Sequence, residues 1–263
     1  MSEAAITSVK LTATKNRIHI LDEVRGFAIV CMVVYHMLYS LAYVFGYASA
    51  EKLLLFFMPI EPVFAALFIF ISGICTVLSR SNLKRGLILA AVALGINVFT
   101  VIFIPSLSIL FGILNLLSFC MIFSGLLDKL PKHIPPAAGL VLSIAMFIFT
   151  WGIRCGHFGL FYKPIIKLPY SLYQTNVLFP IGFHNTDFFS SDYFPILPWS
   201  FVFFAGAFFA KIMSEKRIPQ GIYKSRVPFL SQVGKRSLII YVLHQPVIFA
   251  LVCCIQWIFK ILR

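Results

Sequence analysis

The stretch LDEVRGFAIVCMVVYH, residues 21–36, joins a charged end to a long apolar run. An acidic pair and Arg25 lead directly into the apolar residues, and the quoted stretch ends on His36. The apolar character continues to about residue 46, which gives the roughly 20 residues that a helix needs to cross a bilayer. The stretch therefore predicts a membrane-spanning helix with charge at one end and a titratable ring inside it.

The composition of the whole chain also indicates a membrane protein. Of the 263 residues, 60% are hydrophobic and 12% are charged, and the mean hydropathy is +0.94. Soluble domains average about 45–50% apolar and about 25% charged residues. The apolar runs predict an all-α, polytopic helical bundle of about seven transmembrane helices, at about 24–46, 53–79, 85–104, 107–127, 137–153, 194–213 and 238–259.

The polar segments give the domain organisation. Residues 1–23 lack an apolar core and are expected to form a cytoplasmic N-terminal segment. Residues 24–263 are expected to form one transmembrane domain. Its long connection, 154–193, is rich in Pro, Tyr, Phe and Gly and is interpreted as an extracytoplasmic loop or a re-entrant cap. That connection raises the number of spans if it crosses the bilayer.

The basic residues predict the orientation. Of the 22 Lys and Arg residues, the predicted spans place 16 on one side and leave six on the other: Lys52, Arg154, Lys163, Lys167, Lys260 and Arg263. The positive-inside rule then places the N-terminus in the cytoplasm, in a cell (plasma or inner) membrane. The net charge of +13 fits contact with anionic lipid headgroups. The sequence has no basic stripe interleaved with aromatic residues, so no nucleic-acid partner is expected.

The spacing of Arg25 and His36 places the two on one helix face. Eleven steps of 100° return to within about 20° of the starting direction, and the two residues lie roughly 16 Å apart along the helix. Arg25 is expected at the cytoplasmic headgroup level with Asp22 as its ion-pair partner, and His36 near the middle of the bilayer. An ionisable group inside the membrane is a candidate functional residue. The structural alternatives are an interfacial anchor for Arg25 and a helix–helix hydrogen bond for His36.

Five segments resemble one family of membrane enzymes. They are LDEVRGFAI (21–29), FIFISGICTVLSRSNLKRG (68–86), FGILNLLS (111–118), GFHNTDFFSSDYFPILPW (182–199) and VGKRSLIIYVLHQPV (233–247). Together they resemble the heparan-α-glucosaminide N-acetyltransferase catalytic-domain family, mainly its compact bacterial members. That family lies within the transmembrane acyltransferase superfamily that also includes acyltransferase family 3.

The resemblance implies transfer of an acetyl or other acyl group from cytoplasmic acyl-CoA, normally acetyl-CoA, to a sugar amine or hydroxyl outside. The acceptor would be a carbohydrate or glycolipid. Phosphates of the donor attract cations, and the expected donor-binding residues are Arg25, Arg80, Lys84, Arg85, Lys235, Arg236, Ser237, Tyr241 and His244. His36 would meet the thioester, as a general base or as an acyl-carrying nucleophile.

Two further catalytic candidates are polar residues in predicted spans. Glu61 lies between two prolines and could orient His36 or take the acceptor's proton; its alternative is an exterior position before a helix. Asn115 stands where family members often carry histidine. An asparagine donates to a developing oxyanion and does not act as a base.

The external mouth is expected near Asp192. Its carboxylate, with Tyr193 and Trp199, would bind the sugar acceptor; the alternative is a helix N-cap with interfacial aromatic anchors. His19, His133, His157 and His184 are interpreted as solvated loop residues. The six cysteines show no zinc-site or disulfide spacing, so no metal site is predicted.

The alternative function is a proton-coupled transporter or flippase of a small polar or glycan substrate, because buried His and Glu also serve proton-coupled carriers. Against it, the sequence has no pair of Gly/Pro-broken segments in matching halves. A non-catalytic scaffold needs neither the Arg25–His36 spacing nor intramembrane polar groups. The sequence leaves open whether the chain forms a homodimer.

Overall fold

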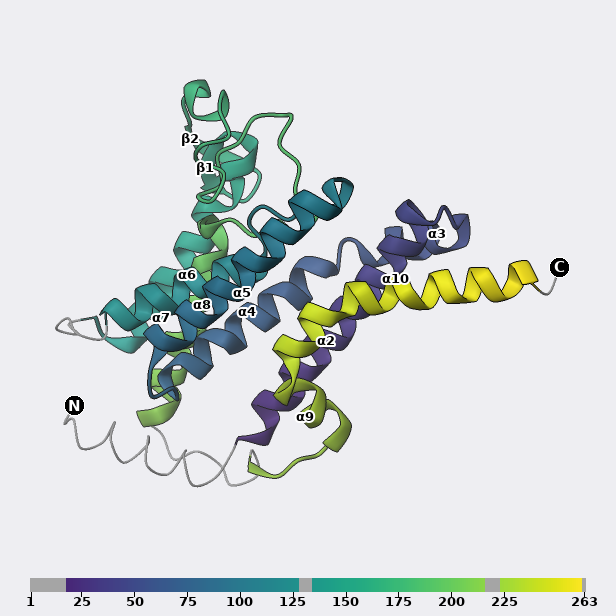
Figure 1. Cartoon of the computed structure of the whole chain (residues 1–263). Coiled ribbons are helices and arrows are strands. Elements are labelled where there is room, and N and C mark those ends of the chain that lie inside the picture. Colours follow the sequence, from purple (N-terminus) through teal and green to yellow (C-terminus); the bar gives the residue numbers. More distant parts are fainter. Residues whose placement is uncertain (1–17, 128–133, 216–222, 262–263) are drawn as a thin grey trace. The chain divides into compact units, whose positions relative to one another are not determined.

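The computed structural model describes residues 18–127, 134–215 and 223–261, and the described chain is mostly helical (Figure 1). These residues form two compact units. Residues 69–127 and 134–215 belong to the first unit, and residues 18–68 and 223–261 belong to the second.

The second unit joins the two ends of the described chain. Its helices are α2 (His19–Tyr39), the π-helical turn η1 (Ser40–Val44), α3 (Ala48–Phe57), the first half of α4 (Glu61–Val77), α9 (Pro228–Lys235) and α10 (Ser237–Ile261). The short helix α9 packs along α2 (Figure 1). A buried apolar cluster packs α3 against the end of α2 and the turn η1. It consists of Leu38, Ala42, Ala50 and Leu54.

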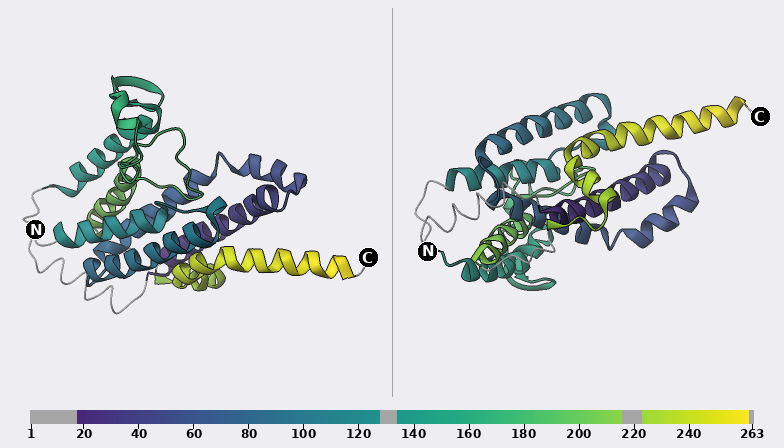
Figure 2. Two further views of the ribbon diagram at one scale, coloured as in Figure 1. Left: turned by 45° about the horizontal axis from the view of Figure 1, so that its top comes forward. Right: turned by 90° about the horizontal axis from the view of Figure 1, so that it is seen from below.

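The first unit is a bundle of helices with a hairpin. Its elements are the second half of α4, α5 (Asn82–Phe103), η2 (Pro105–Leu107), α6 (Ile113–Leu127), α7 (Pro136–Thr150), η3 (Trp151–Cys155), β1 (His157–Leu160), β2 (Lys163–Lys167), η4 (Tyr170–Tyr173) and α8 (Ile196–Glu215). Helix α5 lies along α6, and α7 lies along α8 (Figures 1 and 2).

Glycines let the helices of the first unit approach closely. A Cβ added at Gly73 would collide with the backbone carbonyl of Phe203, and one at Gly206 with that of Phe70. Small residues at such crossings are typical of membrane helix pairs, because packing rather than the hydrophobic effect joins helices in lipid.

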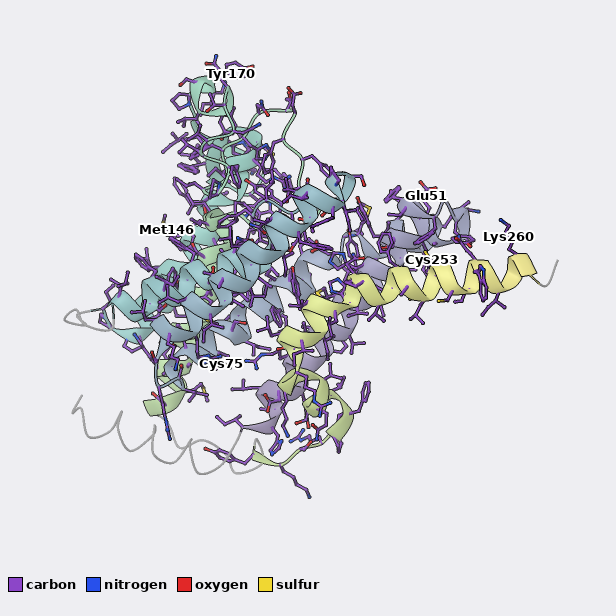
Figure 3. The ribbon with its side chains drawn as sticks, viewed as in Figure 1. Glu51, Cys75, Met146, Tyr170, Cys253 and Lys260 are labelled. Carbon is purple, nitrogen blue, oxygen red and sulfur yellow. The ribbon has the colours of Figure 1, made fainter. Side chains whose placement is uncertain are left out.

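The connection after α7 contains an antiparallel hairpin that the sequence did not reveal. Strand β1 pairs with β2, with His157 opposite Lys167. All of β2 is exposed, and so is Tyr170, which follows it (Figure 3). The segment predicted as a cap therefore has its own secondary structure.

Each predicted apolar segment contains a helix, but the count of about seven spans is not confirmed. Within the described residues, five helices are long and apolar enough to cross a membrane, and a bent pair of helices raises the number to six. The bent pair is Ala48–Phe57 and Glu61–Val77, and the chain bends by 56° from the first helix to the second. Helix α6, predicted as a span over 107–127, is shorter, with 15 residues.

Candidate functional site

His36 lies on α2 one turn before the helix widens into the π-helical turn η1. Such turns often occur at functional sites. The Nδ1 atom of His36 is 3.3 Å from Nε2 of Gln245 on α10. The Oγ atom of Ser40 donates to Oε1 of the same amide over 3.2 Å. Gln245 therefore connects α10 to two successive turns of the first span.

A second imidazole lies beside His36. The ring of His244 has its centroid 5.0 Å from that of His36, with the planes tilted by 54°. Nδ1 of His244 hydrogen-bonds to the backbone carbonyl of Tyr241, and the rings of these two residues lie 5.6 Å apart. Nε2 of His244 is buried and has no hydrogen-bond partner within the part of the chain that the structure describes.

The predicted ion pair at the start of α2 is confirmed. A guanidinium nitrogen of Arg25 lies 3.8 Å from a carboxylate oxygen of Asp22, and both side chains are largely buried. Helix α2 begins at His19, earlier than the predicted start of the span at 24. His19 is therefore helical rather than a solvated loop residue, and its ring contacts the hydroxyl of Ser231 at 3.2 Å.

Two glycines bring α9 against the same turn of α2. A Cβ on Gly234 would collide with the carbonyl of Asp22, and a Cβ on Gly26 would collide with the carbonyl of Leu230. This close crossing places Lys235 and Arg236, both exposed, directly after a residue that touches the Asp22 backbone. Three of the six cations predicted to bind the donor, Arg25, Lys235 and Arg236, thus lie at one end of the α2–α10 pair.

Glu23 fixes the other end of α9. One of its carboxylate oxygens accepts hydrogen bonds from the Ser225 hydroxyl at 2.7 Å and from the backbone N–H groups of Arg226 at 2.7 Å and Val227 at 3.0 Å. Val227 is the residue that precedes α9. Sequence reasoning did not single out Glu23 or Gly26, although both belong to the LDEVRG stretch. In the sequence, the only signal for the contact between α2 and α9 is a glycine in each motif, Gly26 in the first and Gly234 in the last.

Glu61 is the first residue of α4, directly after the break that separates α3 from α4. Its carboxylate interacts electrostatically with Tyr35, the residue before His36. Glu61 thus belongs to the unit that holds the two imidazoles. A carboxylate in the first turn of a helix is stabilised by the helix dipole.

The remaining candidates lie in the first unit, where two motif segments are joined. The Asp192 carboxylate accepts a hydrogen bond from the N–H of Ile113 at 3.2 Å. Phe111 pairs with Tyr193 as an isolated parallel bridge, and the carbonyl of Phe111 accepts from the N–H of Phe194 at 3.0 Å. Asp192 is buried, and this hydrogen bond caps the start of α6.

Asn115 belongs to the same junction. Its Oδ1 accepts a hydrogen bond from the N–H of Gly112 at 3.1 Å, just before α6 begins.

Three of the cations predicted to bind the donor lie in the first unit. Arg80, Lys84 and Arg85 lie around the start of α5 and are exposed.

Tyr193 and Trp199 are packed among other aromatic residues. The Tyr193 hydroxyl donates to the carbonyl of Phe179 at 2.7 Å, and the Arg154 guanidinium lies 5.3 Å from the centre of its ring. Burial raises the pKa of Tyr193 to about 12, although the charge of Arg154 acts in the opposite direction. Trp199 contacts the rings of Phe194, Phe147 and Trp151 at 5.0, 6.0 and 6.1 Å.

His184 is partly buried, which corrects the expectation of a solvated loop residue. Its ring lies 4.7 Å from that of Phe188 and 5.3 Å from that of Tyr193. Its Nδ1 donates to the carbonyl of Asn185 at 2.9 Å. His157 also bonds through its ring, to the carbonyl of Phe161 at 3.2 Å. His133 lies outside the described residues.

Comparison with known proteins identifies the family. A family model described as "Heparan-alpha-glucosaminide N-acetyltransferase, catalytic" matches residues 17–246. The chain belongs to this family. Membership in the heparan-alpha-glucosaminide N-acetyltransferase catalytic family, together with several apolar helices, makes the chain a multi-pass membrane acetyltransferase. No curated protein and no solved structure matches the chain.

Within the residues that the structure describes, no group of three or more His, Cys, Asp or Glu side chains is arranged to hold a metal ion. In the second unit, the two imidazoles and the Gln245 amide lie close together. Acid–base chemistry and hydrogen bonding to a carbonyl group are what these side chains can supply.

Proposed function

We propose that this protein transfers an acetyl group from cytoplasmic acetyl-CoA to a sugar amine or hydroxyl on the extracytoplasmic side of the cell membrane. The observation that carries the proposal is the pair of imidazoles, His36 on the first span and His244 on the last, in a chain of this family. Gln245 of the last span holds the His36 ring. The family match covers residues of both units, which supports one functional domain over 24–263.

The donor end of this site is assigned to the cations around Asp22. Arg25, Lys235 and Arg236 lie at the end of the α2–α10 pair where α9 crosses α2. Cationic side chains bind phosphate oxygens through short, charge-assisted hydrogen bonds. The polyanionic end of CoA binds there, and its long flexible arm carries the thioester inward between the helices.

The reacting end is assigned to the imidazoles. Along α2, His36 follows Arg25 by roughly 16 Å of helix, and along α10, His244 follows Ser237 by roughly 10 Å. Tyr241 lies between these ends on α10 and packs against His244. The acceptor must lose a proton as it attacks the thioester, and an unprotonated imidazole nitrogen accepts it. Glu61, close to Tyr35, orients this part of the site.

The first unit is assigned the acceptor. Asp192, Tyr193 and Trp199 lie together with an aromatic cluster that suits the apolar face of a sugar ring. The predicted role of Asn115 in stabilising the oxyanion stays a prediction from the sequence. The predicted contact of Arg80, Lys84 and Arg85 with the donor stays a prediction from the sequence.

The test is binding of acetyl-CoA to the purified, detergent-solubilised protein, measured as a thermal shift. Dephospho-CoA lacks the 3′-phosphate and serves as the matched control ligand. We expect acetyl-CoA to raise the melting temperature and dephospho-CoA to raise it less, because cations hold the phosphates. No shift at millimolar acetyl-CoA in a well-folded sample would contradict the proposal and turn attention to the transporter alternative.

A further inference from the structure

The hydrogen bond of His244 determines which of its ring nitrogens carries the proton. Its Nδ1 faces the carbonyl of Tyr241, and a carbonyl oxygen can only accept. Nδ1 of the neutral ring is therefore the N–H group, and Nε2 carries the lone pair. That lone pair is buried without a donor among the described residues. A buried acceptor without a partner is unfavourable, so the position suits a proton-donating group of a bound molecule.

The amide of Gln245 gives His36 the opposite tautomer. Ser40 donates its hydroxyl proton to Oε1 of Gln245, which turns the amide nitrogen toward the ring. This nitrogen donates to Nδ1 of His36, so Nδ1 is the acceptor and Nε2 carries the proton. The two neighbouring imidazoles, whose ring centroids lie 5.0 Å apart, thus offer different groups: a lone pair on His244 and an N–H on His36.

We infer that the two rings divide the acid–base work of acetyl transfer, with His244 as the proton acceptor and His36 as the hydrogen-bond donor to the thioester carbonyl. This inference rests on the proposed acetyltransferase function and gives His244 a catalytic role in place of a donor-binding one. Gln245 is a positioning residue, because it acts only through the tautomer of His36.

The transfer needs no reactant other than acetyl-CoA and the acceptor. The amine nitrogen or hydroxyl oxygen of the acceptor attacks the carbonyl carbon of acetyl-CoA, and its proton moves to Nε2 of His244. The new C–N or C–O bond forms as the C–S bond breaks, and the departing CoA thiolate takes the proton back from His244. His36 keeps its proton throughout and stabilises the negative charge that develops on the carbonyl oxygen. The acetyl group passes directly to the acceptor, with no acyl-enzyme.

The variant Gln245→Glu distinguishes this arrangement, in which His36 donates a hydrogen bond, from one in which His36 is the base. A carboxylate only accepts hydrogen bonds, so Glu at this position forces the proton of His36 onto Nδ1 and leaves Nε2 as a base. The size of the side chain and the acceptor for Ser40 are retained. The inference predicts that Gln245→Glu loses acetyl transfer, whereas an enzyme that uses His36 as its base would keep or gain activity.

His244→Gln tests the proton acceptor. The inference predicts a loss of about 100-fold or more in kcat, with acetyl-CoA affinity within about twofold of the wild type. A donor-binding role predicts the opposite division, with weaker acetyl-CoA binding and an unchanged kcat. His157→Gln, in the hairpin, is the matched control and is expected to leave both quantities unchanged.

The deciding experiment combines these variants with ¹⁵N NMR of histidine-labelled full-length protein in detergent, where His36→Gln and His244→Gln assign the signals. We expect an Nδ1–H ring at His244 and an Nε2–H ring at His36. Activity is measured as acetyl transfer from acetyl-CoA to glucosamine. Identical tautomers, or an active Gln245→Glu enzyme, would overturn the inference and leave the proposed function standing. A wild-type protein that shows no thermal shift with acetyl-CoA would overturn the proposed function itself.

Discussion

Gln245 on the last described span reaches His36 on the first, with 3.3 Å between the amide nitrogen and the ring nitrogen. The two residues are 209 positions apart in the chain. The contact fixes the orientation of an imidazole inside a membrane span, where a polar group needs a partner. This hydrogen bond therefore stabilises the packing of the two spans. In the proposed enzyme it also holds the reactive ring in place.

Arg25→Ala is expected to weaken acetyl-CoA binding more than it harms handling of the acceptor. The variant removes a cation from the end of α2 that is assigned to the donor's phosphates, and we expect Kd to rise about tenfold, the effect of losing one charge-assisted hydrogen bond. Binding is measured by titration with acetyl-CoA. Lys224→Ala, which removes an exposed cation elsewhere in the same unit, is the matched control. Unchanged donor affinity in Arg25→Ala would favour an interfacial anchor.

Gly26→Ala should destabilise the protein, because the new Cβ would collide with the backbone carbonyl of Leu230. Overpacking of this kind costs about 1–3 kcal/mol. Gly95→Ala is the matched control, since a Cβ on Gly95 meets no atom within 4 Å, and alanine favours a helix. Thermal unfolding in detergent measures both. Equal melting temperatures for the two variants would contradict the close crossing of α2 and α9.

The raised pKa of Tyr193 predicts a loss of stability at high pH. Burial makes the folded protein hold the phenolic proton up to about pH 12, whereas the unfolded chain releases it near pH 10. The stabilising contribution is therefore complete below pH 10 and is lost as pH rises toward 12. Absorbance of tyrosinate follows the titration, and Tyr193→Phe should reduce the amplitude of the late step by one tyrosine. A titration of Tyr193 near pH 10 would show that its ring is hydrated.

The number of crossings can be tested with a reporter fused after Arg263. If all seven apolar segments cross the bilayer, the C-terminus lies outside the cell, opposite to a cytoplasmic N-terminus. If the short helix α6 does not cross and the bent pair counts as one span, the two ends lie on the same side. A reporter that is active only in the periplasm or cell exterior distinguishes these outcomes. An inactive reporter on a protein that is expressed and inserted in the membrane would mean that the count of seven is wrong.

Much of the fold could be predicted, because lipid imposes a strong and local rule. A segment of apolar residues that enters the bilayer must satisfy its backbone internally, so it becomes a helix. The Asp22–Arg25 pair was equally local, since residues three apart lie on one helix face. The break before Glu61 follows from the two prolines that flank it, which disturb a helix.

The contacts that build the site could not be predicted, because they join distant segments. Glu23 and Gly26 stand inside the first motif, but their partners on and before α9 lie some 200 positions away. Asp192 is a capping residue by type, but the helix start that it caps, at Ile113 of α6, lies 79 positions earlier in the chain. Gln245 lies in the last motif, but nothing in a single sequence indicates which polar side chain faces His36.

The most direct test of the account is acetyl transfer by His36→Ala. Purified protein is given labelled acetyl-CoA and glucosamine, and labelled N-acetylglucosamine is measured, with size-exclusion chromatography to confirm that the variant is folded. The wild type is expected to transfer the label, and His36→Ala to lose about 100-fold or more of that rate. A folded His36→Ala protein that transfers acetyl groups as fast as the wild type would contradict the account.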